Sequence, residues 1–254
     1  MNKIRSTLLA AAAGLAFTGG AQAATVSIGF SPGTLHNASA ISAATVSSAA
    51  MAGMAVTMCF AGVVACETAT WGTGAFAATG GNFAGGDGWR FEAASADTFV
   101  DPFRVSVAGR ELQSFTLYGL GGLTVFDTVF DQGVATNSAT LNSSPGSGNG
   151  RPFTVVSGAA NVARFGVTYF DKVFVAGTDY DDLYLGMRVD FAMANGSNGY
   201  SGIFRFLTDT DRVVTGGTLV QIPTSPPSGV PLPGTLALVG AALLGLGLTR
   251  RRRG

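Results

Sequence analysis

The sequence predicts an all-β protein whose central part forms a single β-sandwich domain with a jelly-roll-like arrangement. Three observations lead to this prediction. Short runs of β-branched and aromatic residues recur between segments rich in Gly, Ser, Thr and Asn. Charged and apolar side chains alternate in Arg188–Phe191 and Arg205–Leu207, as in strands with one buried face. About 205 residues lie between the two terminal segments, enough for one domain with a substantial core.

Twelve segments have strand character, and one segment has the composition of a short helix. The Ala- and Ser-rich stretch Ser39–Met54 is the candidate helix. The expected strands are Thr25–Phe30, Ala55–Val64, Trp89–Glu92, Phe103–Val107, Ser114–Tyr118, Leu123–Phe130, Phe153–Val156, Ala163–Phe170, Lys172–Val175, Asp182–Ala192, Gly202–Leu207 and Gly217–Gln221.

Residues 1–23 have the pattern of a secretory signal peptide. Lys3 and Arg5 form a charged start, Leu8–Phe17 is apolar, and Ala21-Gln22-Ala23 is a small-residue cleavage site. The apolar run is too short for a first transmembrane anchor. The mature chain is therefore expected to begin at Ala24, after cleavage of the Ala23–Ala24 bond.

The domain expected over residues 24–221 is acidic. Nine Arg and Lys stand against fifteen Asp and Glu, which leaves a net charge of −6. Nucleic-acid binding needs clustered basic residues, so we expect no nucleic-acid partner.

Cys59 and Cys66 are the only cysteines. Disulfides persist outside the cytoplasm, and a turn around Gly62 could bring the two residues within bonding reach. The loop between them contains eight residues counted inclusively, and closing it would stabilise the protein by about 2.5 kcal/mol. A metal or redox pair has less support, because there is one histidine and no C-x-x-C motif. We therefore predict a disulfide.

Few motifs point to catalysis. His36 stands alone in a polar stretch and is interpreted as a loop residue, and no G-x-S-x-G motif surrounds a serine. The segment Gly119–Gly122 is interpreted as a turn rather than a phosphate-binding loop. We expect no enzymatic activity and no required cofactor.

Acidic residues cluster at several positions. Asp179, Asp181, Asp209 and Asp211 could offer oxygen ligands to calcium. The alternative is that they cap turns by accepting backbone N–H groups. Both interpretations remain open, and turn structure is the preferred one.

The C-terminal part separates into a stalk and an apolar tail. Residues 222–229 contain three prolines with Ser and Thr, a composition that favours an extended stalk. The uncharged run Thr235–Leu248 would span about 21 Å as a helix, short of the roughly 30 Å hydrocarbon core. A helix from Val230 to Thr249 would be long enough, with the prolines in its first turn. Arg250, Arg251, Arg252 and Arg253 would then remain cytoplasmic, and the domain would lie across the membrane.

Residues 230–254 resemble the PEP-CTERM sorting signal of Gram-negative bacteria. The matching parts are Val230-Pro231-Leu232-Pro233, the apolar run that follows, and the final arginines Arg250–Arg253. The signal's usual glutamate between the prolines is replaced by Leu232, which makes this a VPLP-type variant. The resemblance implies recognition by an exosortase-type sorting protease, transient anchoring in the inner membrane, and delivery to the cell surface or the medium.

Three functions are consistent with the sequence. The resemblance implies an exported, non-enzymatic surface or matrix protein associated with exopolysaccharide and biofilm. The alternative is a glycan-binding module, because β-sandwiches often stack sugars on aromatic side chains. A secreted hydrolase ranks third. The alternative for the aromatic residues is that they fill the core, which the 18 Phe against two Trp favours. The aromatic residues available for stacking are Trp71, Trp89, Tyr169, Tyr180, Tyr184 and Tyr200.

Overall fold

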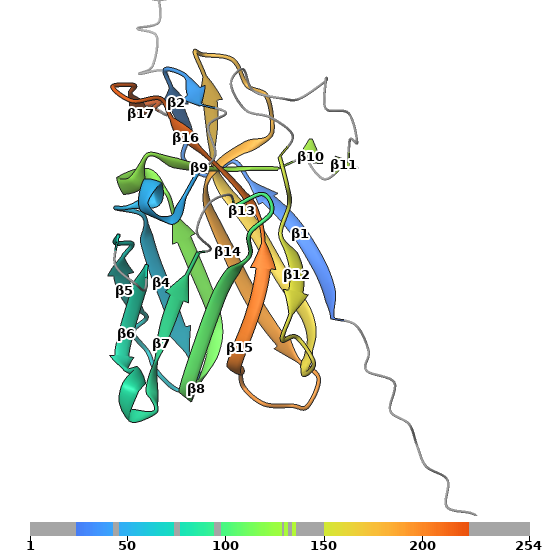
Figure 1. The fold of residues 1–254 in the computed structure, drawn as a ribbon. Helices are drawn as coiled ribbons and strands as arrows, with labels where there is room; N and C mark the ends of the chain where they lie inside the picture. Colours follow the sequence, from blue (N-terminus) through green and yellow to red (C-terminus); the bar gives the residue numbers. More distant parts are fainter. Residues whose placement is uncertain are drawn as a thin grey trace, which may run out of the picture.

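The computed structural model describes residues 24–42, 46–73, 77–93, 98–128, 130–131, 134–135 and 150–223. These residues form seventeen strands and three short 3-10 helices (Figure 1). Fifteen of the strands belong to one hydrogen-bonded sheet. The all-β class predicted from the sequence is therefore confirmed.

Several strands of the large sheet follow each other closely along the chain. Between them lie the 3-10 helices η1 (Ser48–Met51), η2 (Phe83–Gly85) and η3 (Leu120–Gly122). A separate two-stranded pair is formed by β10 (Phe130–Asp131) and β11 (Val134–Ala135). The strands of the large sheet are β1 (Thr25–Ser31), β2 (His36–Ala38), β3 (Ile41–Ser42), β4 (Ala55–Phe60), β5 (Glu67–Thr70), β6 (Ala78–Asn82), β7 (Asp87–Glu92), β8 (Phe103–Tyr118), β9 (Thr124–Asp127), β12 (Thr154–Ser157), β13 (Val162–Val175), β14 (Leu183–Met193), β15 (Tyr200–Leu207), β16 (Asp209–Val213) and β17 (Leu219–Gln221).

Two long strands organise the sheet, and each replaces two shorter strands expected from the sequence. The first half of β8 pairs with β7 and β15, and its second half pairs with β4 and β14. Gly109 lies between the two halves with φ 69°, where a side chain would meet the carbonyl oxygen of Gly86. Strand β13 continues through Asp171, which has φ 59°. The sequence suggested breaks at these positions, whereas the structure bends the strands there without ending them.

The segment Ser39–Met54, which the sequence marked as able to hold a short helix, contains one short 3-10 helix among its described residues. The strand β3 precedes it, η1 is a single turn, and residues 43–45 lie outside the described part of the chain. The Ala- and Ser-rich composition favours a helix, but the backbone of β3 instead pairs with β16. Tertiary pairing has therefore overridden local propensity.

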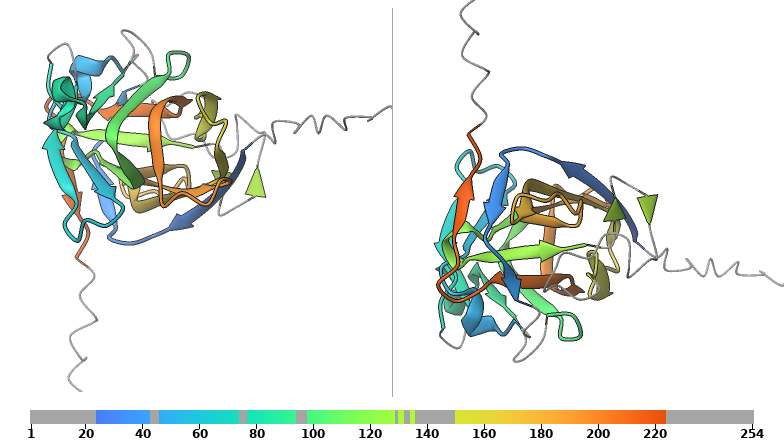
Figure 2. Two further views of the ribbon diagram at one scale, coloured as in Figure 1. Left: turned by 90° about the horizontal axis from the view of Figure 1, so that it is seen from below. Right: turned by 90° about the horizontal axis from the view of Figure 1, so that it is seen from above.

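The end-on views show that the sheet curves round on itself (Figure 2), and the main cluster of buried side chains is rich in aromatic residues. Burial alternates along β4, where Val56, Met58 and Phe60 point inward. Phe206 is fully buried, and its ring lies 4.8 Å from that of Phe153 and 5.2 Å from that of Phe103. We refer to this cluster, which β4, β7, β8, β13, β14 and β15 surround, as the aromatic core.

A second, smaller apolar cluster lies where the last strands of the chain gather, near the top of Figure 1. It consists of Ala38, Ile41, Val125, Val173, Val175, Leu183, Leu185 and Val213. Its elements also hold several buried polar or charged side chains, among them His36, Lys172 and Asp211. We refer to this region, formed by β2, β3, β9, β16, β17, the adjoining ends of β13 and β14 and the turn between them, as the polar end.

Candidate functional site

The predicted targeting residues lie mostly outside the described part of the chain. Ala24 is the first described residue, so Ala23 falls outside. The description ends at Pro223, and the sorting motif Val230–Pro233 and the arginines Arg250–Arg253 lie beyond it. Within the described ranges, no helix has the length and apolar character needed to cross a membrane.

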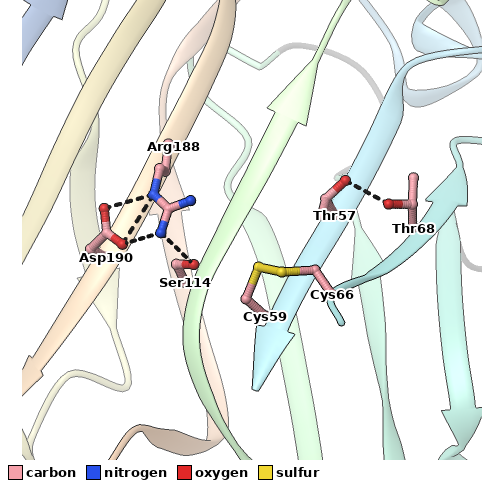
Figure 3. The surroundings of a disulfide bond; sticks show 7 residues. All are labelled: Thr57, Cys59, Cys66, Thr68, Ser114, Arg188 and Asp190. Carbon is pink, nitrogen blue, oxygen red and sulfur yellow. Dashed lines mark hydrogen bonds and ion pairs between the residues drawn. A yellow bond between two sulfur atoms is a disulfide. The ribbon is translucent and has the colours of Figure 1, made fainter. Parts of the chain in front are cut away.

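The structure joins Cys59 and Cys66 in a disulfide, with their Cα atoms 4.3 Å apart (Figure 3). Cys59 lies on β4, and Cys66 immediately precedes β5, so the bond closes the turn of the β4–β5 hairpin. The Thr57 and Thr68 hydroxyl groups lie opposite each other on the same hairpin, 2.8 Å apart. This hairpin tip is exposed, and Val64 has no burial at all.

A polar ladder runs over the outer face of the sheet beside this hairpin (Figure 3). Arg188 on β14 donates to both carboxylate oxygens of Asp190 and, at 3.0 Å, to the Ser114 hydroxyl on β8. The hydrogen bonds to Asp190 raise the pKa of the Arg188 guanidinium. The arrangement joins neighbouring strands and resembles an ordinary surface ion pair more than a binding site.

Asp179 and Asp181, two of the calcium candidates, both form ion pairs with the amine of Lys172. Lys172 Nζ lies 2.8 Å from Asp179 Oδ2 and forms an ion pair with Asp181 Oδ1. The other oxygen of Asp179 accepts the backbone N–H of Asp181 at 2.9 Å. Lys172 is only 7% exposed, which is unusual for a lysine and occurs chiefly when the amine is paired.

The residue before Lys172 forms a second polar junction. Asp171 accepts the backbone N–H of Thr34 at 2.8 Å and the hydroxyl of Tyr118 at 3.0 Å. Burial, together with this bond to Asp171, raises the pKa of Tyr118 to about 12. Asp171 therefore ties the segment before β2 to the end of β8.

Asp209 and Asp211 do not form the turn that the sequence suggested. They lie in strand β16, paired with Asp127 and Val125 of β9, and both side chains are buried. The backbone conformation of Asp209 and Asp211 is fixed by antiparallel pairing with β9 rather than by side-chain capping of a turn. Among the described residues, no group of three or more His, Cys, Asp or Glu side chains is arranged to hold a metal ion. The calcium site stays a prediction.

His36 is not the loop residue expected from the sequence. It lies in β2 between Val173 of β13 and Gln221 of β17, with 3% of its surface exposed. Neither ring nitrogen has a hydrogen-bond partner in the described structure. Burial lowers the pKa of His36, although the charge of Asp171 opposes this effect.

Most of the aromatic residues proposed to stack on sugars are core residues. Trp71, Trp89, Tyr169, Tyr184 and Tyr200 are buried, and only Tyr180 is partly exposed. Each buried indole has a partner: the Trp71 N–H donates to the Ser48 carbonyl, and the Trp89 N–H donates to Glu67. Their flat faces are therefore not available to a ligand.

A polar cavity of about 270 Å³ lies at the other end of the sheet from the polar end. It lies between the β12–β13 and β14–β15 connections and the adjacent part of β8. Its lining residues include Glu111, Asn161, Asn195, Ser197 and Ser201. Some of their polar atoms are already bonded within the loops: Glu111 Oε2 accepts the N–H of Asn198, Asn195 Oδ1 accepts the N–H of Ser197, and the Ser197 hydroxyl donates to the Gly199 carbonyl. The described lining contains no cationic side chain.

Comparison with known proteins identifies no relative: no family model, no curated protein and no solved structure matches this chain.

The site that sequence analysis missed is the one around Lys172. The sequence did contain a signal for it, because Lys172 is the only lysine outside residues 1–23. The other eight basic residues of the domain are arginines. Lys172 is also close to Asp179 and Asp181 along the chain, but only the structure shows that both carboxylates reach its amine.

Proposed function

We propose that this protein is an exported, non-enzymatic surface or matrix protein that an exosortase-type enzyme sorts and that associates with exopolysaccharide. The observation that carries the proposal is the order of segments along the chain. A signal-peptide pattern precedes an all-β domain, and a Pro-rich stalk and a PEP-CTERM-like tail follow its last strand β17. In this proposal the tail crosses the inner membrane as a helix before it is removed.

The domain itself has features that suit an extracytoplasmic location. The Cys59–Cys66 disulfide lies on an exposed hairpin, where it would be reduced in most cytoplasms. The acidic charge of the domain disfavours nucleic acid. We further propose that the curved sheet is a jelly-roll-like sandwich in which β8 passes from one layer to the other.

Intact-mass analysis of the protein exported from cells with and without the sorting enzyme tests this proposal. The expected product begins at Ala24 and ends near Pro231–Pro233 when the enzyme is present. Replacing Pro231 and Pro233 by alanine should leave the tail attached, whereas the same replacement at Pro226 and Pro227 in the stalk should not. A product that retains Arg250–Arg253 in every strain would show that the tail is a permanent anchor.

A second candidate function, a glycan-binding module, is favoured by the polar cavity beside Glu111. Carboxylate, amide and hydroxyl groups around a cavity of this size can bind the hydroxyl groups of one sugar residue. A glycan array tests it, with Asn195→Ala as the variant expected to lose binding. Thr68→Ala, on the distant β5 surface, is the matched control. Absence of binding to any glycan, or equal binding by both variants, would exclude this site.

A further inference from the structure

The geometry around Lys172 points to a covalent modification, and we propose that its amine condenses with the carboxyl group of Asp181 to form an intramolecular isopeptide bond. The proposal is independent of how the tail is processed, because all of its residues lie within the β13–β14 hairpin. The three groups needed are an amine, a carboxyl group to receive it, and a second carboxyl group to carry protons.

The amine is placed in contact with its acceptor. Lys172 Nζ touches Asp181 Oδ1, and that oxygen is sealed from solvent. Lys172 itself is 7% exposed, so its amine has little competing water. Reacting groups held in a well-oriented geometry can reach effective concentrations of about 10⁵–10⁸ M, and the proposal requires Nζ to approach Asp181 Cγ in this way.

Asp179 is positioned to assist. Its Oδ2 lies 2.8 Å from Lys172 Nζ, and its Oδ1 holds the backbone N–H of Asp181 at 2.9 Å. One carboxylate therefore touches the nucleophile and fixes the residue that carries the acceptor. Asp181 is held with φ 64°, a left-handed backbone conformation that residues other than glycine seldom adopt and that tends to occur at functional sites.

The choice of amino acid supports the same conclusion. The described ion pairs at Arg104, Arg110 and Arg188 all use arginine, the residue better suited to a plain ion pair with a carboxylate. Lysine appears once in the domain, at the most buried of these positions. A guanidinium could keep the ion pair with Asp181, whereas only a primary amine can form this amide.

The reaction balances without an oxidant or a co-reactant. A proton passes from the Lys172 ammonium group to the Asp181 carboxylate, which gives a neutral amine and a neutral acid. The amine then attacks Asp181 Cγ, Asp179 takes a proton from the nitrogen and returns it to the departing hydroxyl group, and water leaves. A bond forms between Nζ and Cγ, one C–O bond breaks, and nothing is oxidised or reduced.

Peptide mass spectrometry of the purified full-length protein tests the proposal. Trypsin should not cleave after the acylated Lys172, so Phe165–Arg188 should appear as one peptide that is lighter by one water. Fragmentation should place the link between Lys172 and Asp181. An aspartyl succinimide would also lose water, but it leaves Lys172 open to trypsin and to amine-reactive reagents.

Four variants sharpen the result. Lys172→Arg and Asp181→Ala should each give peptides of unmodified mass. Asp179→Ala keeps both reacting groups and should lose most of the linked peptide, whereas Asp190→Asn, in an ion pair on the outer face, should keep all of it. A wild-type protein that is cleaved after Lys172, labelled there by an amine reagent and unchanged in mass would overturn the proposal, whatever the variants do.

Discussion

The aromatic core and the polar end are built from the same sheet but differ in what they bury. The aromatic core is filled by rings such as Phe103, Phe115 and Phe206, which pack between long strands. The polar end has a small aliphatic cluster, and its elements bury His36, Lys172 and several aspartates. Apolar burial contributes in proportion to area, whereas buried polar groups stabilise only when they are paired. We therefore expect the aromatic core to supply most of the stability. The polar end holds the residues of the proposed amide bond between Lys172 and Asp181.

The strongest test of this comparison is a cavity in the aromatic core. Phe206→Ala removes a fully buried ring that stacks on Phe103 and Phe153. We expect the free energy of unfolding to fall by about 3–5 kcal/mol, measured by urea denaturation. Ile203→Ala on the same strand is the control, because Ile203 is 47% exposed and should cost far less. Equal losses in the two variants would show that the core does not dominate stability.

The disulfide should have the next largest effect. Replacing Cys59 and Cys66 together by alanine removes the covalent link across the β4–β5 turn. The loop-entropy relation gives a loss of about 2.5 kcal/mol in the free energy of unfolding. The same denaturation curves measure it, with reduction of the unmodified protein as a second route. A loss larger than that of Phe206→Ala would reverse the ranking of hairpin and core.

His36 should make the polar end sensitive to pH. Because burial lowers its pKa in the folded state, the unfolded chain binds the proton more readily. The contribution of neutral His36 to the free energy of unfolding is therefore fully present above pH about 6.5, the pKa in the unfolded chain. It is lost as the pH falls below that value. We expect His36→Leu to flatten this part of the stability profile, measured by urea denaturation between pH 7.5 and pH 5. An unchanged slope in the variant would assign the effect to other groups.

The smallest effect is expected on the outer face. Asp190→Ala removes the partner of Arg188, a pair in which both side chains are nearly half exposed. Exposed ion pairs contribute about 0.2–1 kcal/mol, and salt screens them. Thermal unfolding at low and high salt should show a small loss that shrinks as salt is added. A loss above that range would mean that Arg188 also holds β8 through its bond to Ser114.

Sequence analysis predicted the fold class correctly but several boundaries wrongly. Alternation and turn composition are local properties, and they were sufficient to identify strands such as β4, β14 and β15. The two-residue strand β3 and the strand β16 carry no such pattern, because their backbone is fixed by partners far away in the chain. The same reason explains why His36 and Asp209 were interpreted as loop and turn residues.

The sequence by itself determined the class of the domain, its acidic charge, and the predicted export and sorting segments, because each depends on composition or on the order of residues along the chain. Only the tertiary structure decided which side chains meet. It placed five of the six candidate sugar-stacking aromatics inside the protein and left Tyr180 partly exposed. It also brought Asp179 and Asp181 onto the amine of Lys172. That meeting depends on the register of β13 and β14 and on a turn in which Ala176, Gly177 and Asp181 are left-handed, which no local pattern specifies.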